Sequence, residues 1–424
     1  MIRFLLKGIL RDKNRSMLPI IIVSIGVMLT VFLSGYIRGV MGDMIDMSAR
    51  FQTGHVKVMS EAYAENQEQM PNDLALLGVA QIKSNLESKY ADYEWVSRIR
   101  FGGLVDVPLP DGNTKSQGPG AGLAIDLFSP GGEEIERFNI KNSLMKGVIP
   151  KKSGEAILTD EFANKLNVNI GDEITFFGST MNGSMTFKNF ALAGTIKFGN
   201  LAMDRGTIII DISDAQAMLD MDDGAGEILG FRKAGAYYDD EVRGMATGYN
   251  AAFANDTDEF KPKMVTLGQQ NNMASMIDYT ENMSAIFVAI FVFAMSIVLW
   301  NTGLIGGLRR YQEFGIRLAL GESKGQIYRS LFSEAFLIGA IGSALGTGIG
   351  LFFCFLLQKH GFDISDMMPE SSMLYPNVLR AKMTPDLYYI GFIPGLFSMV
   401  FGNMLAGLGI YKRETAQLFK EFEV

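Results

Sequence analysis

Four long apolar stretches divide the chain into segments that suit a lipid bilayer and segments that suit water. Residues 17–37, 284–306 and 387–410 contain no charged residue, and residues 332–357 contain only Glu334. A helix of about 20 apolar residues spans the ~30 Å hydrocarbon core of a bilayer. The pattern therefore predicts four transmembrane helices over these ranges.

The segment between the first two apolar stretches, residues 38–283, has the pattern of a water-soluble domain. Its strand-like runs cover residues 55–59, 102–109, 121–128, 155–159, 173–177, 185–198 and 206–211, and its helix-like runs cover residues 73–90, 160–166, 213–221 and 239–253. Strands and helices interleave without a regular βαβ period, which is typical of an α+β domain. The expected fold class is an α-helical membrane protein with four transmembrane helices and a large extracytoplasmic α+β domain.

Polar and glycine signals mark several helix ends. Ser213 with Gln216, and Ser323 with Gln326, have the form of capping boxes, and Gly321 is placed to end a helix.

Two further helix features are expected near the second and fourth apolar stretches. Residues 268–283 contain few helix breakers, so they predict a helical stalk that continues into the second stretch; a loop ending at Glu281 is the alternative. In the fourth stretch, Pro394 is expected to kink the helix, and Asn403 needs a polar partner inside the bundle.

The distribution of positive charge predicts the topology. Residues 1–16 carry five basic residues, and the loop 307–331 carries Arg309, Arg310, Arg317, Lys324 and Arg329 against Glu313 and Glu322. Short segments rich in Lys and Arg stay in the cytoplasm. We therefore expect a cytoplasmic interfacial helix over residues 1–16 that contacts membrane lipids, a cytoplasmic loop over 307–331 and a cytoplasmic tail over 411–424. Residues 38–283 and the loop 358–386 are then external.

The acidic residues are concentrated in the predicted external domain. Residues 43–281 hold 21 basic and 35 acidic residues, a net charge of −14, in a chain whose net charge is −8. This distribution gives no basic footprint for nucleic acid. Cys354 is the single cysteine, so the external domain must be held together by its core rather than by an intrachain disulfide.

The loop between the second and third apolar stretches, GGLRRYQEFGIRLALGESKGQIYRSL, is too polar to span a bilayer. Within it, Tyr311, Phe314, Gly315 and Leu318 recur at helical spacing. This spacing predicts a short amphipathic helix lying across the membrane surface. A plain basic loop between two spans is the alternative interpretation.

The same loop carries a family resemblance. QEFGIRLALGESKGQIYRSLFSEAFLIG resembles the signature loop of the FtsX/LolC/LolE/MacB superfamily of ABC-transporter permeases (type VII, mechanotransmission), and KGILRDKNRSMLPIIIVSIGV is similar to their first-helix signature. Residues 144–176 and GHVKV (54–58) resemble parts of the MacB and LolC/LolE external domains, which implies a MacB-like periplasmic core domain. Tyr311-Gln312 stands where those permeases more often have a basic pair, and the tail lacks their usual proline.

In these permeases the loop contains a coupling helix that docks on the ATP-hydrolysing subunit. The resemblance implies this role for residues 309–321, with the contact made by Arg309, Arg310, Glu313, Phe314, Gly315, Ile316, Arg317, Ala319, Leu320 and Gly321. It also implies that an ABC ATPase dimer and a second permease copy or paralogue are partners. ATP and Mg would bind to the ATPase, and this chain would hold no cofactor.

A glycine repeat lies in the third apolar stretch. Gly342, Gly346 and Gly350 form two overlapping GxxxG steps on one helical face. Such faces allow helices to approach closely in lipid. The repeat predicts helix packing, either against a second permease or within the same bundle.

Motifs for catalysis or metal binding are weak in this sequence. No GxxxxGK[ST] motif occurs, GTGIG (346–350) lies inside an apolar stretch, and DMDDG (220–224) has its glycine one residue too early for a calcium loop. His55 and His360 have no Cys or His at metal-ligand spacing. We therefore expect a non-catalytic subunit without a metal site.

The expected function is that of a permease subunit in the bacterial cytoplasmic (inner) membrane, which converts ATP hydrolysis by a partner into motion of the external domain. Extraction of a lipoprotein or lipid-like cargo is the first hypothesis, favoured by the large external domain and by GHVKV. The alternatives are efflux of peptide or macrolide-like compounds with a periplasmic adaptor, a cargo-free mechanical switch that activates a cell-wall hydrolase, and a sensor without an ATPase partner.

Overall fold

The computed structural model describes residues 13–129, 132–199, 201–233, 239–270, 273–309, 311–364 and 378–412. The chain divides into two compact units. Unit 1 consists of Met1–Asp43, Met276–Ile364 and Val378–Val424, and unit 2 consists of Met44–Ser275 and Ser365–Asn377. Most of the predicted interfacial helix and of the predicted tail lies outside the described residues.

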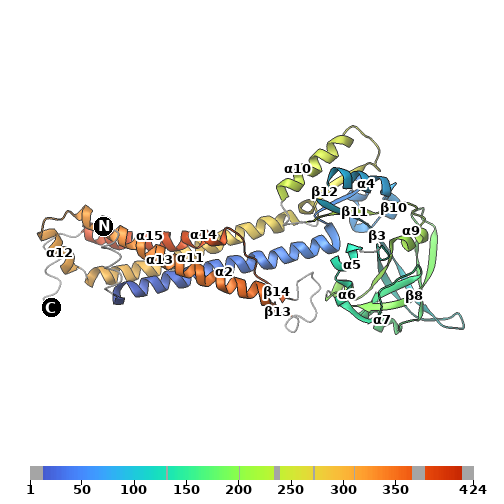
Figure 1. Cartoon of the computed structure of the whole chain (residues 1–424), viewed down its shortest axis with the longest axis horizontal. Helices are drawn as coiled ribbons and strands as arrows, with labels where there is room; N and C mark the ends of the chain where they lie inside the picture. Colours follow the sequence, from blue (N-terminus) through green and yellow to red (C-terminus); the bar gives the residue numbers. More distant parts are fainter. Residues whose placement is uncertain are drawn as a thin grey trace. The chain divides into compact units, whose positions relative to one another are not determined.

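The long helices of unit 1 form a bundle (Figure 1). They are α2 (Lys13–Ser48), α11 (Met273–Arg309), α13 (Lys324–His360) and α15 (Phe392–Lys412), with the short helices α12 (Tyr311–Ala319) and α14 (Leu387–Ile390) and the strands β13 (Phe362–Asp363) and β14 (Val378–Leu379). Apolar side chains of α2, α11, α13, α14 and α15 share one core, which includes Val27, Met295 and Ile338. α11 runs as one helix from Met273 to Arg309, so the helical continuation predicted for residues 268–283 is present from Met273 onward, and its role as a stalk stays a prediction.

Two described helices are long and apolar enough to cross a membrane by length and composition, Met17–Thr53 and Lys324–His360. Within the described residues the apolar parts of the other two helices, Ala285–Asn301 and Leu387–Gly402, are shorter. The structure therefore supports two of the four predicted spans, and the count of four stays a prediction.

The fourth apolar stretch is interrupted at Gly391, three residues before Pro394. α14 ends at Ile390 and α15 begins at Phe392. Pro394 lies in the first turn of α15 and has no N–H to donate to the carbonyl group of Ile390, four residues earlier, so the break falls in the turn before the proline. A Cβ at Gly391 would lie 2.7 Å from Thr347 Oγ1 on α13 and from Val27 Cγ1 on α2. Close packing thus requires glycine at the interruption, and the kink at Pro394 stays a prediction. The side chain of Asn403 is outside the described part of the chain.

Unit 2 is built on a sheet that, in the described residues, has ten strands in the order β12-β1-β11-β3-β4-β9-β6-β8-β5, with β7 pairing with β3 and β8. The strands are β1 (Val56–Ser60), β3 (Tyr93–Pro108), β4 (Thr114–Ile125), β5 (Leu144–Gly147), β6 (Glu155–Thr159), β7 (Glu173–Ser179), β8 (Met185–Ile196), β9 (Thr207–Asp211), β11 (Glu227–Arg232) and β12 (Pro262–Thr266). A separate short pair joins β2 (Leu76–Leu77) to β10 (Gly224–Ala225).

The long strand β3 belongs to both halves of this sheet. Its first part, Tyr93 to Arg98, pairs with β11, and its second part, Ile99 to Pro108, pairs with β4. Because β7 pairs with both β3 and β8, strands β3, β4, β9, β6, β8 and β7 close into a barrel. β3 is thus a direct link between the barrel and the half-sheet β12-β1-β11.

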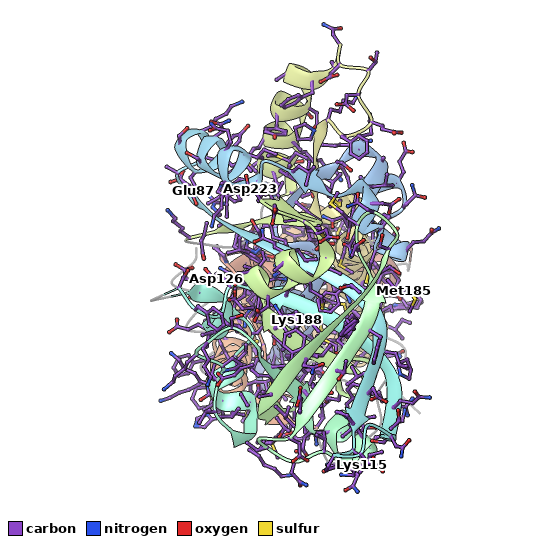
Figure 2. All side chains as sticks on the ribbon, turned by 90° about the vertical axis from the view of Figure 1, so that its right-hand side faces the viewer. Glu87, Lys115, Asp126, Met185, Lys188 and Asp223 are labelled. Carbon is purple, nitrogen blue, oxygen red and sulfur yellow. The ribbon has the colours of Figure 1, made fainter. Side chains whose placement is uncertain are left out.

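Short helices cover the sheet of unit 2. They are α3 (Glu61–Glu65), α4 (Val79–Lys89), α5 (Glu133–Arg137), α6 (Ile140–Ser143), α7 (Asp160–Leu166), α8 (Leu201–Asp204), α9 (Ile212–Leu219) and α10 (Asp239–Asn250). The predicted α+β class is confirmed, and α7 and β6 match their predicted ranges residue by residue. Figure 2 shows the side chains of this unit, with Met185 and Lys188 on β8.

Two predicted helix starts in unit 2 are wrong. The helix expected from residue 73 begins only at Val79, because Leu76–Leu77 pairs with Gly224–Ala225 and Gly78 turns the chain at φ +68°. The N-cap of α9 is Asp211, whose Oδ1 accepts from Ser213 N (2.9 Å). Ser213 is therefore not the cap, since a carboxylate two residues earlier accepts the free N–H.

The DMDDG turn has a structural role. Ala80 N donates to Asp223 Oδ1 (2.9 Å), and Val79 N donates to Asp223 O (3.0 Å). Asp223, labelled in Figure 2, therefore caps the first turn of α4 from a distant part of the sequence.

Candidate functional site

The loop predicted to contact an ATPase forms a short helix between two long ones. α11 ends at Arg309, α12 covers Tyr311–Ala319 and α13 begins at Lys324. Gly321 has φ +94°, and its N–H donates to Leu318 O (3.1 Å). Ser323 and Gln326 form the predicted capping box at the start of α13, which is confirmed. The structure thus has the predicted loop helix instead of the plain loop that was its alternative.

One side of this loop segment exposes apolar side chains. Ile316 is 57% exposed, and Leu320, four residues later, is 81% exposed. Of the predicted stripe, Gly315 is buried and Leu318 is half-buried; the side chains of Tyr311 and Phe314 lie outside the described part of the chain. Ile316 and Leu320 form an apolar ridge that a partner can cover.

The structure brings together only part of the predicted contact set. The residues of this set whose exposure is described are Gly315, Ile316, Arg317, Ala319, Leu320 and Gly321. Arg309, Glu313 and Phe314 lie on helices, but their side chains are outside the described part, as is all of Arg310. Whether an ATPase binds this segment stays a prediction.

The glycine repeat of α13 faces α2 of the same chain. A Cβ added at Gly342, Gly346 or Gly350 would lie 2.8, 2.8 or 2.9 Å from the Cβ of Val23, Val27 or Val31, respectively. Ser24 Oγ also donates to Gly342 O (3.2 Å). Of the two roles that the sequence leaves open, packing within the bundle is the one seen in this chain.

A polar contact holds α2 further along the bundle. Arg38 forms an ion pair with Asp386 and donates to Thr384 Oγ1 (2.9 Å). Lys382 N donates to Gly35 O (3.0 Å). These bonds fasten α2 to the segment that precedes α14.

Within unit 2, α2 passes into a π-helix, Ala49–Thr53, that ends at Gly54. Gly54 has φ +62°, and a Cβ there would lie 2.7 Å from Val56 O, so the turn into β1 requires glycine. The last carbonyl groups of a helix have no intrahelical donor and carry the negative end of the helix dipole. Cationic donors are therefore favourable around this π-helix.

Two arginines of β3 supply such donors. Arg98 Nη1 donates to Arg50 O (2.8 Å), and Arg100 Nη2 donates to Phe51 O (2.8 Å). Arg98 is fully buried; its Nε and Nη2 donate to Glu134 at 2.6 and 3.1 Å. Burial lowers the pKa of Arg98, and the contact with Glu134 opposes this shift. We call the π-helix with Arg98, Arg100, Glu134 and Gln270 the helix junction.

Gln270 connects the beginning of α11 to the same π-helix. Gln270 is buried, and its Nε2 donates to Thr53 O (3.3 Å) and Thr266 O (3.1 Å). β1 follows the π-helix, β12 precedes Gln270, and these strands pair with Val56 opposite Thr266. The ends of α2 and α11 in unit 2 are therefore attached to neighbouring strands.

A buried ion pair lies next to the helix junction. Lys57 Nζ is 2.9 Å from Glu227 Oε1, and Arg100 Nε is 3.6 Å from Glu227 Oε2. Burial lowers the pKa of Lys57 to about 8. For Glu227, burial raises the pKa, but Lys57 and Arg100 outweigh it and the pKa is lowered. Both groups are therefore ionised at neutral pH.

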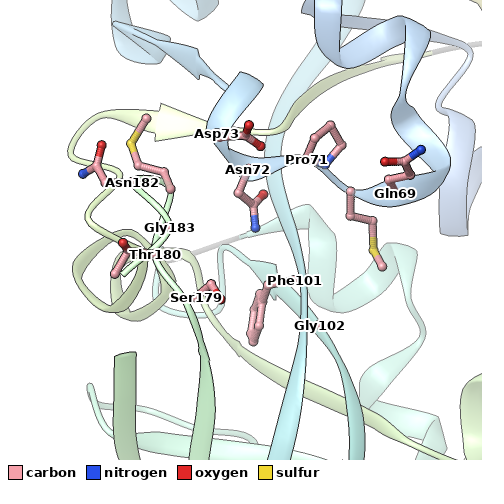
Figure 3. Close-up of a pocket in the computed structure, with 12 residues that line it drawn as sticks. Gln69, Pro71, Asn72, Asp73, Phe101, Gly102, Ser179, Thr180, Asn182 and Gly183 are labelled. Atoms are coloured by element: carbon pink, nitrogen blue, oxygen red, sulfur yellow. The ribbon is translucent and has the colours of Figure 1, made fainter. Parts of the chain in front are cut away.

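Unit 2 also has a cavity of about 660 Å³ (Figure 3). It is lined by residues 69–73, Phe101, Gly102 and residues 179–183. Asn72 Oδ1 is buried and lacks a hydrogen-bond partner among the described residues. The lining offers amides, hydroxyls and the carboxylate of Asp73, without a histidine, cysteine or basic side chain. It suits a neutral polar ligand better than acid–base catalysis.

Comparison with protein families gives a match for the membrane part. Residues 285–415 match the family described as FtsX-like permease C-terminal. This range begins inside α11, includes α12 and α13, and ends just beyond α15. Over this range the chain is similar to FtsX-like permeases. The resemblance predicted from QEFGIRLALG is thereby confirmed.

The chain also resembles a solved structure. The crystal structure of the periplasmic region of MacB from Actinobacillus actinomycetemcomitans is similar at 9% identity and a TM-score of 0.36, over 53% of this chain and 94% of that chain. Similarity of this degree carries no argument about fold, so a MacB-like external domain stays a prediction. No curated protein matches the chain.

The helix junction is a feature of this chain that the sequence predictions missed. The predicted strand begins at residue 102, whereas β3 begins at Tyr93 and includes Arg98 and Arg100. The available signal was RIRF (98–101), in which two cations alternate with apolar residues. A strand with this pattern places both cations on one face, where a buried position requires a partner.

Proposed function

We propose that this FtsX-like permease is the membrane subunit of an ABC transporter and converts ATP hydrolysis by a partner chain into motion of its external α+β domain. The observation that carries the proposal is the FtsX-like match over residues 285–415, which includes the loop helix α12 between two long apolar helices. This chain itself contributes no catalytic residues. ATP and Mg are bound by the partner.

The proposed topology has four spans with both termini and α12 in the bacterial cytoplasm. The basic residues of the 307–331 loop support this orientation, since Lys and Arg are retained inside. Residues 38–283 then face the periplasm or cell exterior. Two ATPase subunits require two permeases, so the second copy or a paralogue completes the assembly.

The proposed mechanism uses the apolar ridge of α12 as the docking surface. Closure of the ATPase dimer displaces α12, and α11 and α2 transmit the displacement as continuous helices. Such a response requires two packings of the helices whose free energies differ by a few kcal/mol. The glycine face of α13 against α2 supports this requirement. Because glycine has no side chain, few side chains interdigitate between the two helices, and one helix can shift along the other.

The proposed cargo is a lipoprotein or a lipid-like molecule extracted from the inner membrane. The large external domain favours this over a cargo-free switch acting on a cell-wall hydrolase. Efflux of peptide or macrolide-like compounds with a periplasmic adaptor is the second candidate, since the polar cavity of unit 2 could receive a small polar ligand.

Affinity purification of the tagged full-length permease tests the transporter class. An ATP-binding protein should co-purify in stoichiometric amount, and its absence would leave the sensor alternative.

Depletion of the permease then tests the cargo. Lipoproteins should accumulate in the inner membrane; unchanged lipoprotein sorting together with altered drug tolerance would favour efflux.

Substitution in the loop tests the docking site. Glu313→Lys reverses a charge, and Gly315→Trp places a large side chain at a buried position of α12. Both should uncouple ATP hydrolysis from transport while the external domain stays folded. Full coupling in both variants would locate the ATPase contact elsewhere.

A further inference from the structure

The carbonyl groups at the end of the π-helix are satisfied by strand and side-chain donors of the external domain. Ala49 O accepts from Gly54 N (2.9 Å), and Arg50 O and Phe51 O accept from the two β3 arginines. Thr53 O accepts from Gln270. Water satisfies such carbonyl groups at an exposed helix end; here protein side chains do so, which ties the π-helix to β3 and to Gln270.

Burying the charged side chain of Arg98 costs desolvation free energy. A buried ion pair contributes little net stability compared with apolar side chains of similar volume, and its best-supported value is to specify one arrangement. Arg98 has bidentate contact with Glu134 and lies 4.5 Å above the centre of the Phe138 ring. Its Nη1 group is thereby aimed at Arg50 O in one fixed direction.

The π-helix is also attached to the barrel through an aromatic side chain. Phe51 contacts Phe138 with ring centroids 5.3 Å apart and Phe198 with centroids 5.6 Å apart. β1, which follows directly, pairs with β11 in the other half of the sheet. The π-helix therefore has contacts to both halves that β3 connects.

We propose that Arg98 and Arg100 are positioning residues that couple displacement of α2 to β3. This inference rests on the proposed function, because it assigns the point at which helix motion enters the external domain. Displacement of the π-helix pulls on charge-assisted hydrogen bonds to β3, and β3 passes the motion to β11 on one side and to the barrel on the other. Phe51 supports the same transfer.

Arg100 is the better residue to change, because 24% of its side chain is exposed whereas Arg98 is fully buried. Arg100→Gln removes the positive charge and the guanidinium group whose Nη2 donates to Phe51 O. Arg100→Lys keeps the charge and one donor, so it should restore part of the coupling. Lys188→Gln is the matched control: Lys188 also pairs with a buried carboxylate, Asp214, at 2.7 Å, and 26% of its side chain is exposed.

The experiment measures hydrogen–deuterium exchange of the full-length permease with its co-purified ATPase in lipid nanodiscs, with and without a non-hydrolysable ATP analogue. In the wild type and in Lys188→Gln, the analogue should change exchange in α12 and also in β1, β3 and β11. In Arg100→Gln, α12 should still respond, whereas the response of β1, β3 and β11 should fall at least about twofold. Exchange of β6 and β9 without nucleotide reports whether the variant is folded.

An undiminished strand response in folded Arg100→Gln would overturn the inference. A wild type whose α12 does not respond to the analogue would instead contradict the proposed function, which separates the two failures. If Arg100→Gln does not fold, Phe51→Ala is measured in the same way: a reduced strand response with an intact α12 response supports the inference, and a full strand response overturns it. Failure of both variants to fold would show a role in stability alone and would also overturn it.

Discussion

At the scale of residues, single glycines decide how closely the helices of this permease pack. Gly346 lies where a Cβ would be 2.5 Å from Ser24 O and 2.8 Å from Val27 Cβ, whereas a Cβ at Gly348 on the same helix would meet nothing within 4 Å. Glycine is therefore required at one position and only tolerated at the other. GxxxG spacing in the sequence identifies the face but does not tell which helix covers it.

Gly346→Leu should destabilise the bundle because the larger side chain overlaps α2. Overpacking of this kind typically costs about 1–3 kcal/mol or more. The measurement is the thermal unfolding midpoint of the detergent-solubilised permease. Gly348→Leu should stay close to the wild type, and an equal loss in both variants would contradict the packing described for α13 and α2.

The buried pair of Lys57 and Glu227 predicts a dependence of stability on pH. The pKa of Lys57 is lowered from 10.5 to about 8 on folding, so between these values the unfolded chain binds more protons than the folded chain. The free energy of unfolding contributed by this group therefore rises with pH through that window. Below pH 8 the group is charged in both states and its burial cost is fully present.

Comparison of the wild type with Lys57→Met/Glu227→Leu isolates this contribution. From pH about 8 to about 10, the unfolding midpoint of the wild type should rise relative to that of the double variant. A constant difference across this range would mean that Lys57 titrates near its ordinary pKa in the folded protein.

At the scale of elements, local signals in the sequence predict a helix or strand well where no distant partner competes. α7 and the capping box of α13 follow from their own residues. β11 and β12 were missed because Glu227 and Pro262 disfavour a strand locally, and their pairing with β1 and β3 decides their structure. The cap of α9 was assigned to Ser213 because the stronger acceptor Asp211 belongs to the preceding strand.

The candidate site shows the same division. The loop helix α12 could be predicted because its helical spacing and Gly321 are local. The helix junction could not, because each of the described bonds to the π-helix from Arg98, Arg100 and Gln270 joins residues at least 48 positions apart. The side-chain contacts of Glu313 and Phe314 lie outside the described residues.

The apolar ridge of α12 predicts a separable docking defect. Ile316→Asp and Leu320→Asp place charges on an exposed apolar surface, so they should weaken ATPase binding at least about tenfold with little effect on folding. The measurement is co-purification of the ATPase. Ile170→Asp, a similar change on an exposed residue of unit 2, should leave binding unchanged; equal losses would point to a general defect.

Topology can be tested with single cysteines. Cys354 is buried, so the wild type should react little with a membrane-impermeant maleimide applied to intact cells. Asp222→Cys in the external domain should be labelled, and Leu320→Cys should be labelled only after the membrane is permeabilised. Labelling of Leu320→Cys in intact cells would invert the proposed orientation.

At the scale of the whole molecule, the proposed function gives one chain two tasks: α12 receives a displacement, and the helix junction delivers it to β3, the strand that both halves of the sheet in unit 2 share. No residue of the chain needs to perform chemistry for this to work. What the chain requires is continuous helices and attachment at both ends, which α2 and α11 have in the packing and polar contacts described above.

Photocrosslinking from position 320 in living cells tests this central claim most directly. A photoreactive residue at Leu320, which is 81% exposed, should attach to an ATP-binding protein, while the same residue at Ile170 should not. Crosslinking of an ATP-binding protein from position 320 alone is the predicted result. Absence of any such adduct at position 320, or its appearance at position 170, would contradict the account.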